Sequence, residues 1–258
     1  PVNIIDKVRA YDKQSDLARV TGIDDGEEET VLDLSVKPGM NKGWFGNADV
    51  AAGTEDRYSG KVMLNRFIGE NQFTVIGSMN NVNDNGYPGG GGGFRWGGQN
   101  GLTSIKMGGF NFSTQSEKLE TGGSVNYNYK DADIISKQAS ETFVSSATSS
   151  FKNAQNANRN KTTSLTADFR IEWKPDTMTT VIFRPRLTYG KNDNRSATNS
   201  FTFSQDPEHT TDEILSAADN LSSLIPEENI VNTIARNSLQ KGDNFNVGGS
   251  AMVNSRLG

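Results

Sequence analysis

The segment LTADFRIEWK, residues 165–174, decides the fold because its side chains alternate strictly in polarity. The apolar set is Leu165, Ala167, Phe169, Ile171 and Trp173, and the polar set is Thr166, Asp168, Arg170, Glu172 and Lys174. A period of two residues is typical of a β-strand with two different faces. A soluble sandwich would turn the charged face to bulk water and a membrane barrel would turn it to the lumen, so alternation alone leaves both open.

A second strand with the same pattern follows after Pro175, Asp176 and Thr177, and the two strands predict a hairpin. Its apolar positions are Val181, Phe183, Leu187 and Tyr189, and its polar positions include Thr180, Arg184, Arg186 and Thr188. Pro185 falls on the apolar side and has no N–H to donate. We therefore expect a bulge or an unpaired position there.

The same reasoning extends in both directions to about eight strands. They are predicted at residues 44–53, 57–68, 72–82, 102–114, 118–131, 161–174, 178–194 and 241–256. Tight connections are expected at 69–71, 115–117 and 175–177, and long ones at 83–101, 132–160 and 195–240. Short turns at one rim and long loops at the other are typical of outer-membrane barrels, whereas a sandwich has no reason to sort its loops.

Composition agrees with a sheet that is wet on one face. Hydrophobic residues make up only 33%, the mean hydropathy is −0.61 and there are 27 glycines, which is too little aliphatic material for a conventional core. No stretch approaches the roughly 20 apolar residues of a membrane helix, so any crossing must use strands. The chain begins at Pro1 without a signal sequence, and we expect that signal to be removed or to lie upstream.

Aromatic residues fall near the ends of the predicted strands. Toward the rim with tight turns lie Trp44, Phe45, Phe67, Phe73, Phe112 and Trp173, and toward the other rim Tyr58, Tyr127, Tyr129 and Tyr189. Aromatic rings concentrate at membrane interfaces, so two girdles are predicted. Ordinary strand aromatics remain the alternative.

Several functional classes find no support in the sequence. Without cysteine there are no disulfides or thiolate sites, and a net charge of −5 with dispersed basic residues does not favour nucleic-acid binding. The single histidine, His209, has no nucleophile motif around it, so no enzyme activity is predicted. The acidic run at 24–29 lacks EF-hand spacing, and the glycine-rich run at 88–98 lacks the Lys-Ser/Thr of a phosphate loop, so no metal or cofactor is expected.

Two predicted loops carry further features. Phe94, Arg95 and Trp96 form an aromatic and cationic tip that could contact a ligand, although packing against a neighbouring loop would also use them. In the loop 195–240, Thr211 is the expected cap of a short amphipathic helix, and residues 227–236 are expected to form a second helix.

Residues 1–40 lack the strand pattern of the rest and contain the segments IDKV at 5–8, YDKQSD at 11–16, TGIDDG at 21–26 and LDL at 32–34. Through these segments the chain resembles the Bacteroidetes-type TonB-dependent outer-membrane receptors. The resemblance implies that residues 1–40 are the C-terminal part of a plug domain and that 41–258 are the N-terminal part of a transmembrane β-barrel of about 22 strands. The expected fold is thus all-β, a partial antiparallel barrel of about eight strands preceded by the end of a plug.

The resemblance also implies a function and a location. We expect a bacterial outer-membrane receptor that takes up a small solute, glycan or peptide through a plugged barrel, with membrane lipid and a TonB-type energising protein as partners. Arg170, Arg184 and Arg186 are expected to face the lumen. A surface barrel for adhesion or assembly that does not transport, and a soluble β-rich binding module, remain the alternatives.

Overall fold

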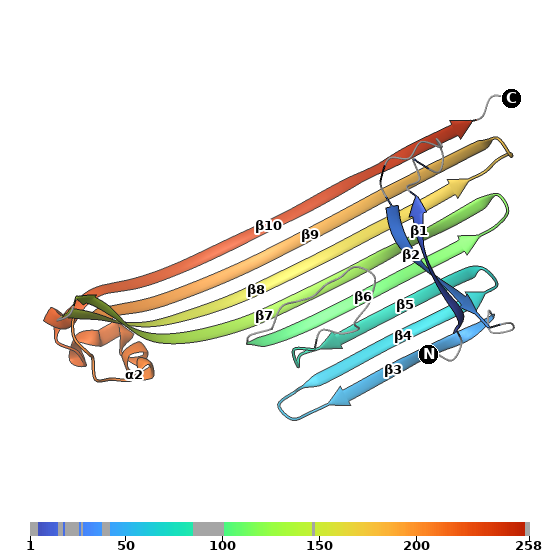
Figure 1. Cartoon of the computed structure of the whole chain (residues 1–258). Helices are drawn as coiled ribbons and strands as arrows, with labels where there is room; N and C mark the ends of the chain where they lie inside the picture. The colour runs from blue at the N-terminus through green and yellow to red at the C-terminus, as the bar shows by residue number, and fades with distance from the viewer. Residues whose placement is uncertain are drawn as a thin grey trace.

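The chain forms two antiparallel sheets (Figure 1). The computed structural model describes residues 5–14, 18, 26, 28–37, 42–84, 101–145 and 148–255. Strands β1 (Ile5–Gln14) and β2 (Glu28–Val36) make the small sheet. The large sheet is an eight-stranded meander of β3 (Lys42–Ala52), β4 (Tyr58–Ile68), β5 (Asn71–Asn80), β6 (Leu102–Gln115), β7 (Leu119–Ser145), β8 (Thr148–Trp173), β9 (Thr179–Phe203) and β10 (Ile230–Ser255).

All eight predicted strands are present in the large sheet, and the all-β antiparallel prediction is confirmed. Each strand pairs with the next one in sequence, and the order runs from β3 at one edge to β10 at the other. Among the described residues β3 and β10 do not pair with each other, so the sheet is open. The tight turns that precede β5, β7 and β9 gather at one rim, at the right of Figure 1.

The last four strands are much longer than predicted. Residues 132–160, expected as a loop, belong almost entirely to the β7–β8 hairpin, and β9 and β10 take up much of the predicted loop 195–240. We call these added residues of β7 to β10 the extension. The sequence shows no alternation of apolar and polar residues in the extension, because both of its faces carry Ser, Asn, Gln and Lys. Backbone hydrogen bonds to neighbouring strands hold the extension together in place of apolar burial.

The register divides the large sheet into an apolar face and a polar face. Antiparallel partners point to the same side, so each cross-strand row belongs to one face. The apolar face carries Val50, Val62, Leu64, Val75, Phe110, Val125, Leu165, Ala167, Ile171, Phe183, Leu187, Val247 and Val253. Val50, Phe183 and Val247 are exposed, so this face lacks a cover among the described residues.

The register also shows on which face of the sheet each residue of the predicted aromatic girdles lies. Trp44, Phe73, Phe112 and Trp173 lie on the apolar face with the four tyrosines. Phe45 and Phe67 do not, because they occupy positions of opposite parity and stack on each other across the polar face, with ring centroids 5.3 Å apart.

Pro185 leaves the expected unpaired position. The β8–β9 ladder is interrupted where Phe169 and Arg170 face Arg184 and Pro185, and the register is the same on both sides of the gap. The missing N–H explains the interruption, and no bulge is needed.

The β8–β9 turn depends on one carboxylate. Asp176 Oδ1 accepts hydrogen bonds from the backbone N–H groups of Met178 (2.8 Å) and Thr179 (2.7 Å). The bond from Met178 is the main reason that the pKa of Asp176 is lowered. A carboxyl group with a lowered folded pKa stabilises the fold above its unfolded pKa and loses that contribution as pH falls through the folded value.

We therefore expect acid to loosen this turn in the wild type and not in Asp176→Asn, whose amide oxygen accepts the same bonds without titrating. Hydrogen exchange at Met178 and Thr179, corrected for intrinsic rates, measures this in the intact protein. Equal loss of protection in both proteins as pH falls would contradict the assignment.

Short helices cap the far end of the long strands. These are α2 (Thr211–Ser216) and the 3₁₀ turns η2 (Ala218–Ser223) and η3 (Glu227–Asn229). The first predicted helix is confirmed, and the second is wrong because β10 begins at Ile230. The cap core contains Phe201, Phe203, Ile214, Leu221 and Ile225. Lys137 on β7 forms an ion pair with Asp212, and Thr211 donates to Asn153 of β8 at 2.6 Å.

The N-cap of α2 is Thr210, one residue before the predicted Thr211. Its side chain accepts from the backbone N–H of Glu213, and the Glu213 carboxylate accepts from the N–H of Thr210 at 2.8 Å. Thr210→Ala should lower the local opening free energy of α2 by about 1 kcal/mol. Faster hydrogen exchange in α2, with Thr210→Ser unchanged, is the expected result, and equal exchange in the two variants would count against the cap.

Candidate functional site on the polar face

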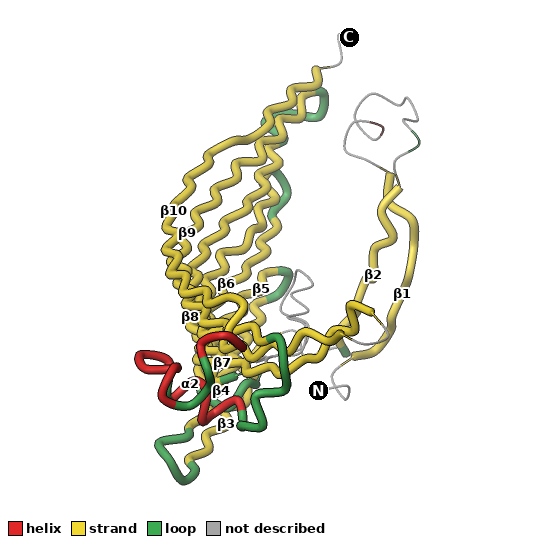
Figure 2. The backbone as a smooth tube through the Cα atoms, turned by 90° about the vertical axis from the view of Figure 1, so that its left-hand side faces the viewer, coloured by secondary structure: helices red, strands yellow, loops and turns green. Residues whose placement is uncertain are grey.

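The β1–β2 hairpin stands off one side of the curved large sheet (Figure 2). The polar face holds buried side chains, since Asn65, Ser78, Glu172 and Ile182 all lie on it and all are buried. On the apolar face of the same strands Val75 and Phe183 are exposed. The polar face is therefore the side on which a binding site can be built.

Three arginines come together on this face. Arg170 belongs to β8, and Arg184 and Arg186 belong to β9, at positions that the register places on the polar side. They line one hollow of about 730 Å³ together with Asp168, Thr188 and Asn246. The interrupted ladder beside Pro185 lies within this hollow, so the backbone groups there add to its polar lining.

An ion-pair network fixes the end of the hollow that is nearer to the tight turns. Arg170 contacts Glu120 of β7 through Nη1 at 3.1 Å and Glu172 through Nη2 at 2.5 Å. Lys174 Nζ lies 3.1 Å from the other oxygen of Glu172, whose side chain is only 1% exposed. A buried carboxylate is tolerated when it is paired, and Glu172 has a cation at each of its two oxygens.

The other end of the hollow is more open. Arg186 Nε lies 3.1 Å from Asp168 Oδ1, and both side chains are at least half exposed. A guanidinium held on one side by a carboxylate still presents further N–H donors. Arg184 and Arg186 are two positions apart on one strand, so this end can hydrogen-bond the oxygen atoms of a polar or anionic solute.

The predicted residues have different outcomes. Arg170, Arg184 and Arg186 share one face of the sheet, as their parity predicted, and they also line one hollow. Phe94, Arg95 and Trp96 lie outside the described residues. Glu120, Glu172 and Lys174 were not singled out from the sequence: alternation gives their face, but the burial of Glu172 depends on what covers that face.

Other site types find no candidates in the described part of the chain. It holds no cluster of three His, Cys, Asp or Glu side chains that could bind a metal. No helix in the same ranges is long and apolar enough to cross a membrane. Comparison with protein-family models, curated proteins and solved structures found no match.

Proposed function

We propose that this chain is part of a TonB-dependent-type outer-membrane receptor. In this proposal the large sheet is a section of the barrel wall, the β1–β2 hairpin belongs to the plug, and the polar face lines the lumen. A polar solute passes along that face when the energised plug moves. The resemblance of residues 1–40 to this family motivates the mechanism.

One observation carries the proposal: apolar side chains stand exposed on one face of the large sheet, and charged and polar side chains are buried on the other. Val75, Phe183 and Val247 stand exposed on one side, and Glu172 is buried among cations on the other. A sheet in a soluble protein buries its apolar face and exposes its polar face to water. Here it is the apolar face that is exposed. It is the arrangement expected of a wall with lipid outside and plug inside.

Strand length supports the same interpretation. The apolar run on β8, from Leu165 to Trp173, covers about nine residues, which is the length that a tilted strand needs to cross a bilayer. Tyr127 and Tyr189 lie in register with Leu165 at the upper end of the run, and Trp173 lies at the lower end. Aromatic rings at both limits match the two interfaces of a membrane.

The test uses the full-length gene in its own host. Uptake of a radiolabelled iron chelate, an oligosaccharide and an oligopeptide is compared before and after deletion of the gene. We expect one class to depend on the gene, and its uptake to stop when the proton gradient is dissipated. Arg184→Ala/Arg186→Ala should reduce that uptake, with Arg236→Ala on β10 as the matched control.

Two results would count against this function. One is recovery of the intact protein in the aqueous fraction without detergent, which would remove the membrane placement. The other is normal uptake after deletion of the segment that contacts the energising partner, which would leave a barrel without TonB-dependent transport.

A surface barrel for adhesion or assembly is the second candidate, and the long strands favour it. From Asp131 to Ser145, β7 continues about 15 residues past the aromatic positions, or about 50 Å at 3.3 Å per residue. Such a wall with a helical tip offers a large external surface. Unchanged solute uptake together with lost attachment in a gene deletion would select this function.

A further inference from the structure

A groove crosses the apolar face where three glycines lie together. Gly77 on β5 and Gly108 on β6 are direct cross-strand partners, and Gly60 on β4 lies in the adjacent row of the same face. Glycine has no side chain, so the backbone forms the floor of the groove at these three positions. The groove has a volume of about 480 Å³, which is within the range of small-molecule sites.

Apolar side chains line the edges of this groove. The cross-strand partners of the three glycines include Val62, Met79 and Tyr127, and all three side chains are exposed. A Cβ atom added at Gly108 would meet no atom within 4 Å, so the floor there has room for a ligand atom. The groove is therefore suited to a hydrocarbon chain.

A lysine stands at one end of the groove. Lys106 precedes Gly108 by two positions on β6, so it shares the apolar face, and it lines the groove. Its Nζ lies 5.8 Å from the ring centroid of Tyr129, its cross-strand partner, in a cation–π contact. Among the described residues no carboxylate forms an ion pair with Lys106. The described part of the protein therefore does not neutralise this charge.

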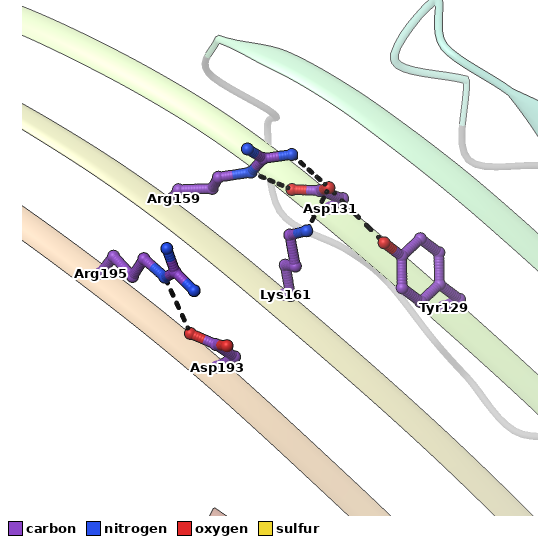
Figure 3. Close-up of polar contacts among 6 residues, drawn as sticks. All are labelled: Tyr129, Asp131, Arg159, Lys161, Asp193 and Arg195. Atoms are coloured by element: carbon purple, nitrogen blue, oxygen red, sulfur yellow. Dashed lines mark hydrogen bonds and ion pairs between the residues drawn. The ribbon is translucent and has the colours of Figure 1, made fainter. Parts of the chain in front are cut away.

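Two aspartates in the next row of the same face are already paired (Figure 3). Asp131 accepts hydrogen bonds from Arg159 Nε at 3.1 Å and from Arg159 Nη2 at 3.0 Å. Asp193 accepts a hydrogen bond from Arg195 Nε at 3.3 Å. These carboxylates are engaged by arginines of the extension, so they do not serve as the counter-charge of Lys106.

Strand positions place Lys106 at the level of the tyrosines. Lys106 and Tyr127 lie almost equally far from the tight β6–β7 turn, nine residues before the end of β6 and eight after the start of β7. Val62 and Gly77 lie six residues from the facing ends of β4 and β5. The groove thus runs about 10 Å from the tyrosine level toward the tight-turn rim. With the tyrosines at the membrane interface, as in the proposed function, Lys106 lies among head groups and the glycine floor lies beside hydrocarbon.

We propose that this groove holds one acyl chain of a phosphorylated membrane lipid and that Lys106 binds the phosphate group of the same lipid. The groove provides an apolar surface without side chains in the way of the chain. The ammonium group provides the opposite charge at the level where lipid phosphates lie. This inference rests on the membrane placement of the proposed function, but it does not depend on transport.

The experiment uses the full-length protein in detergent and counts bound lipids by native mass spectrometry. The probes are dipalmitoyl phosphatidic acid, dipalmitoylglycerol, which has the same chains without the phosphate, and inorganic phosphate. A basic residue near a membrane surface contributes about fivefold to the binding of an anionic lipid. Phosphatidic acid should therefore bind the wild type about fivefold more tightly than dipalmitoylglycerol does.

The charge is tested with Lys106→Gln, which should bind phosphatidic acid about fivefold more weakly than the wild type and should lose the preference for phosphate. The matched control is Lys191→Gln. It removes a lysine from the same row of the same face, outside the groove, and should bind as the wild type does.

The groove is tested with Gly108→Leu, which should lose the bound lipid because the leucine side chain fills the floor. The variant should fold, since its Cβ atom meets no protein atom within 4 Å. Circular dichroism and resistance of the folded band to heating in gels verify this. Ala251→Leu is the matched control, because it adds apolar bulk at an exposed position of the same face on β10. It should bind as the wild type does.

Four outcomes would overturn the proposal. They are equal binding of the two lipids by the wild type, equal binding by the two glutamine variants, equal binding by the two leucine variants, and inorganic phosphate competing as strongly as the lipid. Gene-dependent uptake that persists alongside any of these outcomes separates failure of the lipid site from failure of the transport function.

Discussion

Val75→Arg is expected to lower the folding stability of the intact protein in a bilayer by about 2–4 kcal/mol, the cost of an arginine facing lipid near the midplane. Val75 lies in the middle of β5 on the apolar face, and it is 45% exposed. In water a substitution at such a partly exposed position changes stability by about 0.5 kcal/mol or less. The loss of stability caused by Val75→Arg therefore distinguishes an apolar face that contacts lipid from one that contacts water.

The measurement is urea unfolding of the full-length protein in phospholipid vesicles. Gln72→Arg is the matched control, because Gln72 is exposed on the polar face of the same strand. It should remain within about 0.5 kcal/mol of the wild type. Equal effects at positions 72 and 75 would mean that the two faces meet the same environment, and the barrel wall would have to be abandoned.

Gly123→Ala is expected to destabilise the sheet by about 1–3 kcal/mol through overpacking. A Cβ atom at this position would lie 2.4 Å from Cδ1 of Phe169 and 2.8 Å from the carbonyl oxygen of Asp168. The carbonyl belongs to the backbone of β8 and cannot move aside alone. The β7–β8 pairing must therefore shift to admit the methyl group.

The neighbouring Gly122 supplies the control for this experiment. A Cβ atom there would meet only the carbonyl oxygen of Phe112, at an ordinary 3.4 Å. Gly122→Ala should match or slightly exceed the wild type in stability, since alanine restricts the unfolded chain. Urea midpoints of the two variants in the same detergent give the comparison, and a Gly122→Ala variant as unstable as Gly123→Ala would contradict steric overlap as the cause.

The sequence predicts the strands of the sheet where the two faces differ. Residues 165–174 alternate because one side is apolar and the other polar, so strand, face and parity follow from them. The same parity correctly groups Arg170, Arg184 and Arg186. Parity also shows why the prediction that Phe45 and Phe67 belong to an aromatic girdle was wrong. Both residues lie near the predicted rim but on the polar face.

The remainder could not be predicted because it depends on partners rather than on local pattern. Residues 132–160 are polar on both sides and are predicted as a loop, yet β7 and β8 pair with each other through this segment and β8 also pairs with β9, which keeps the residues extended. Arg159 and Arg195 become neighbours only through the β8–β9 register. Glu172 looks like any exposed strand carboxylate until the covering of the polar face is known.

The length of β7 to β10 has a mechanical consequence. The hydrogen bonds between antiparallel strands run perpendicular to the strand direction. A force that pulls the helical tip along the strands therefore loads many bonds in shear at once, and they must break together. A force that peels β10 sideways from β9 breaks the bonds one pair at a time. The extension should thus resist tension along its axis and yield to a force that peels one strand from the next.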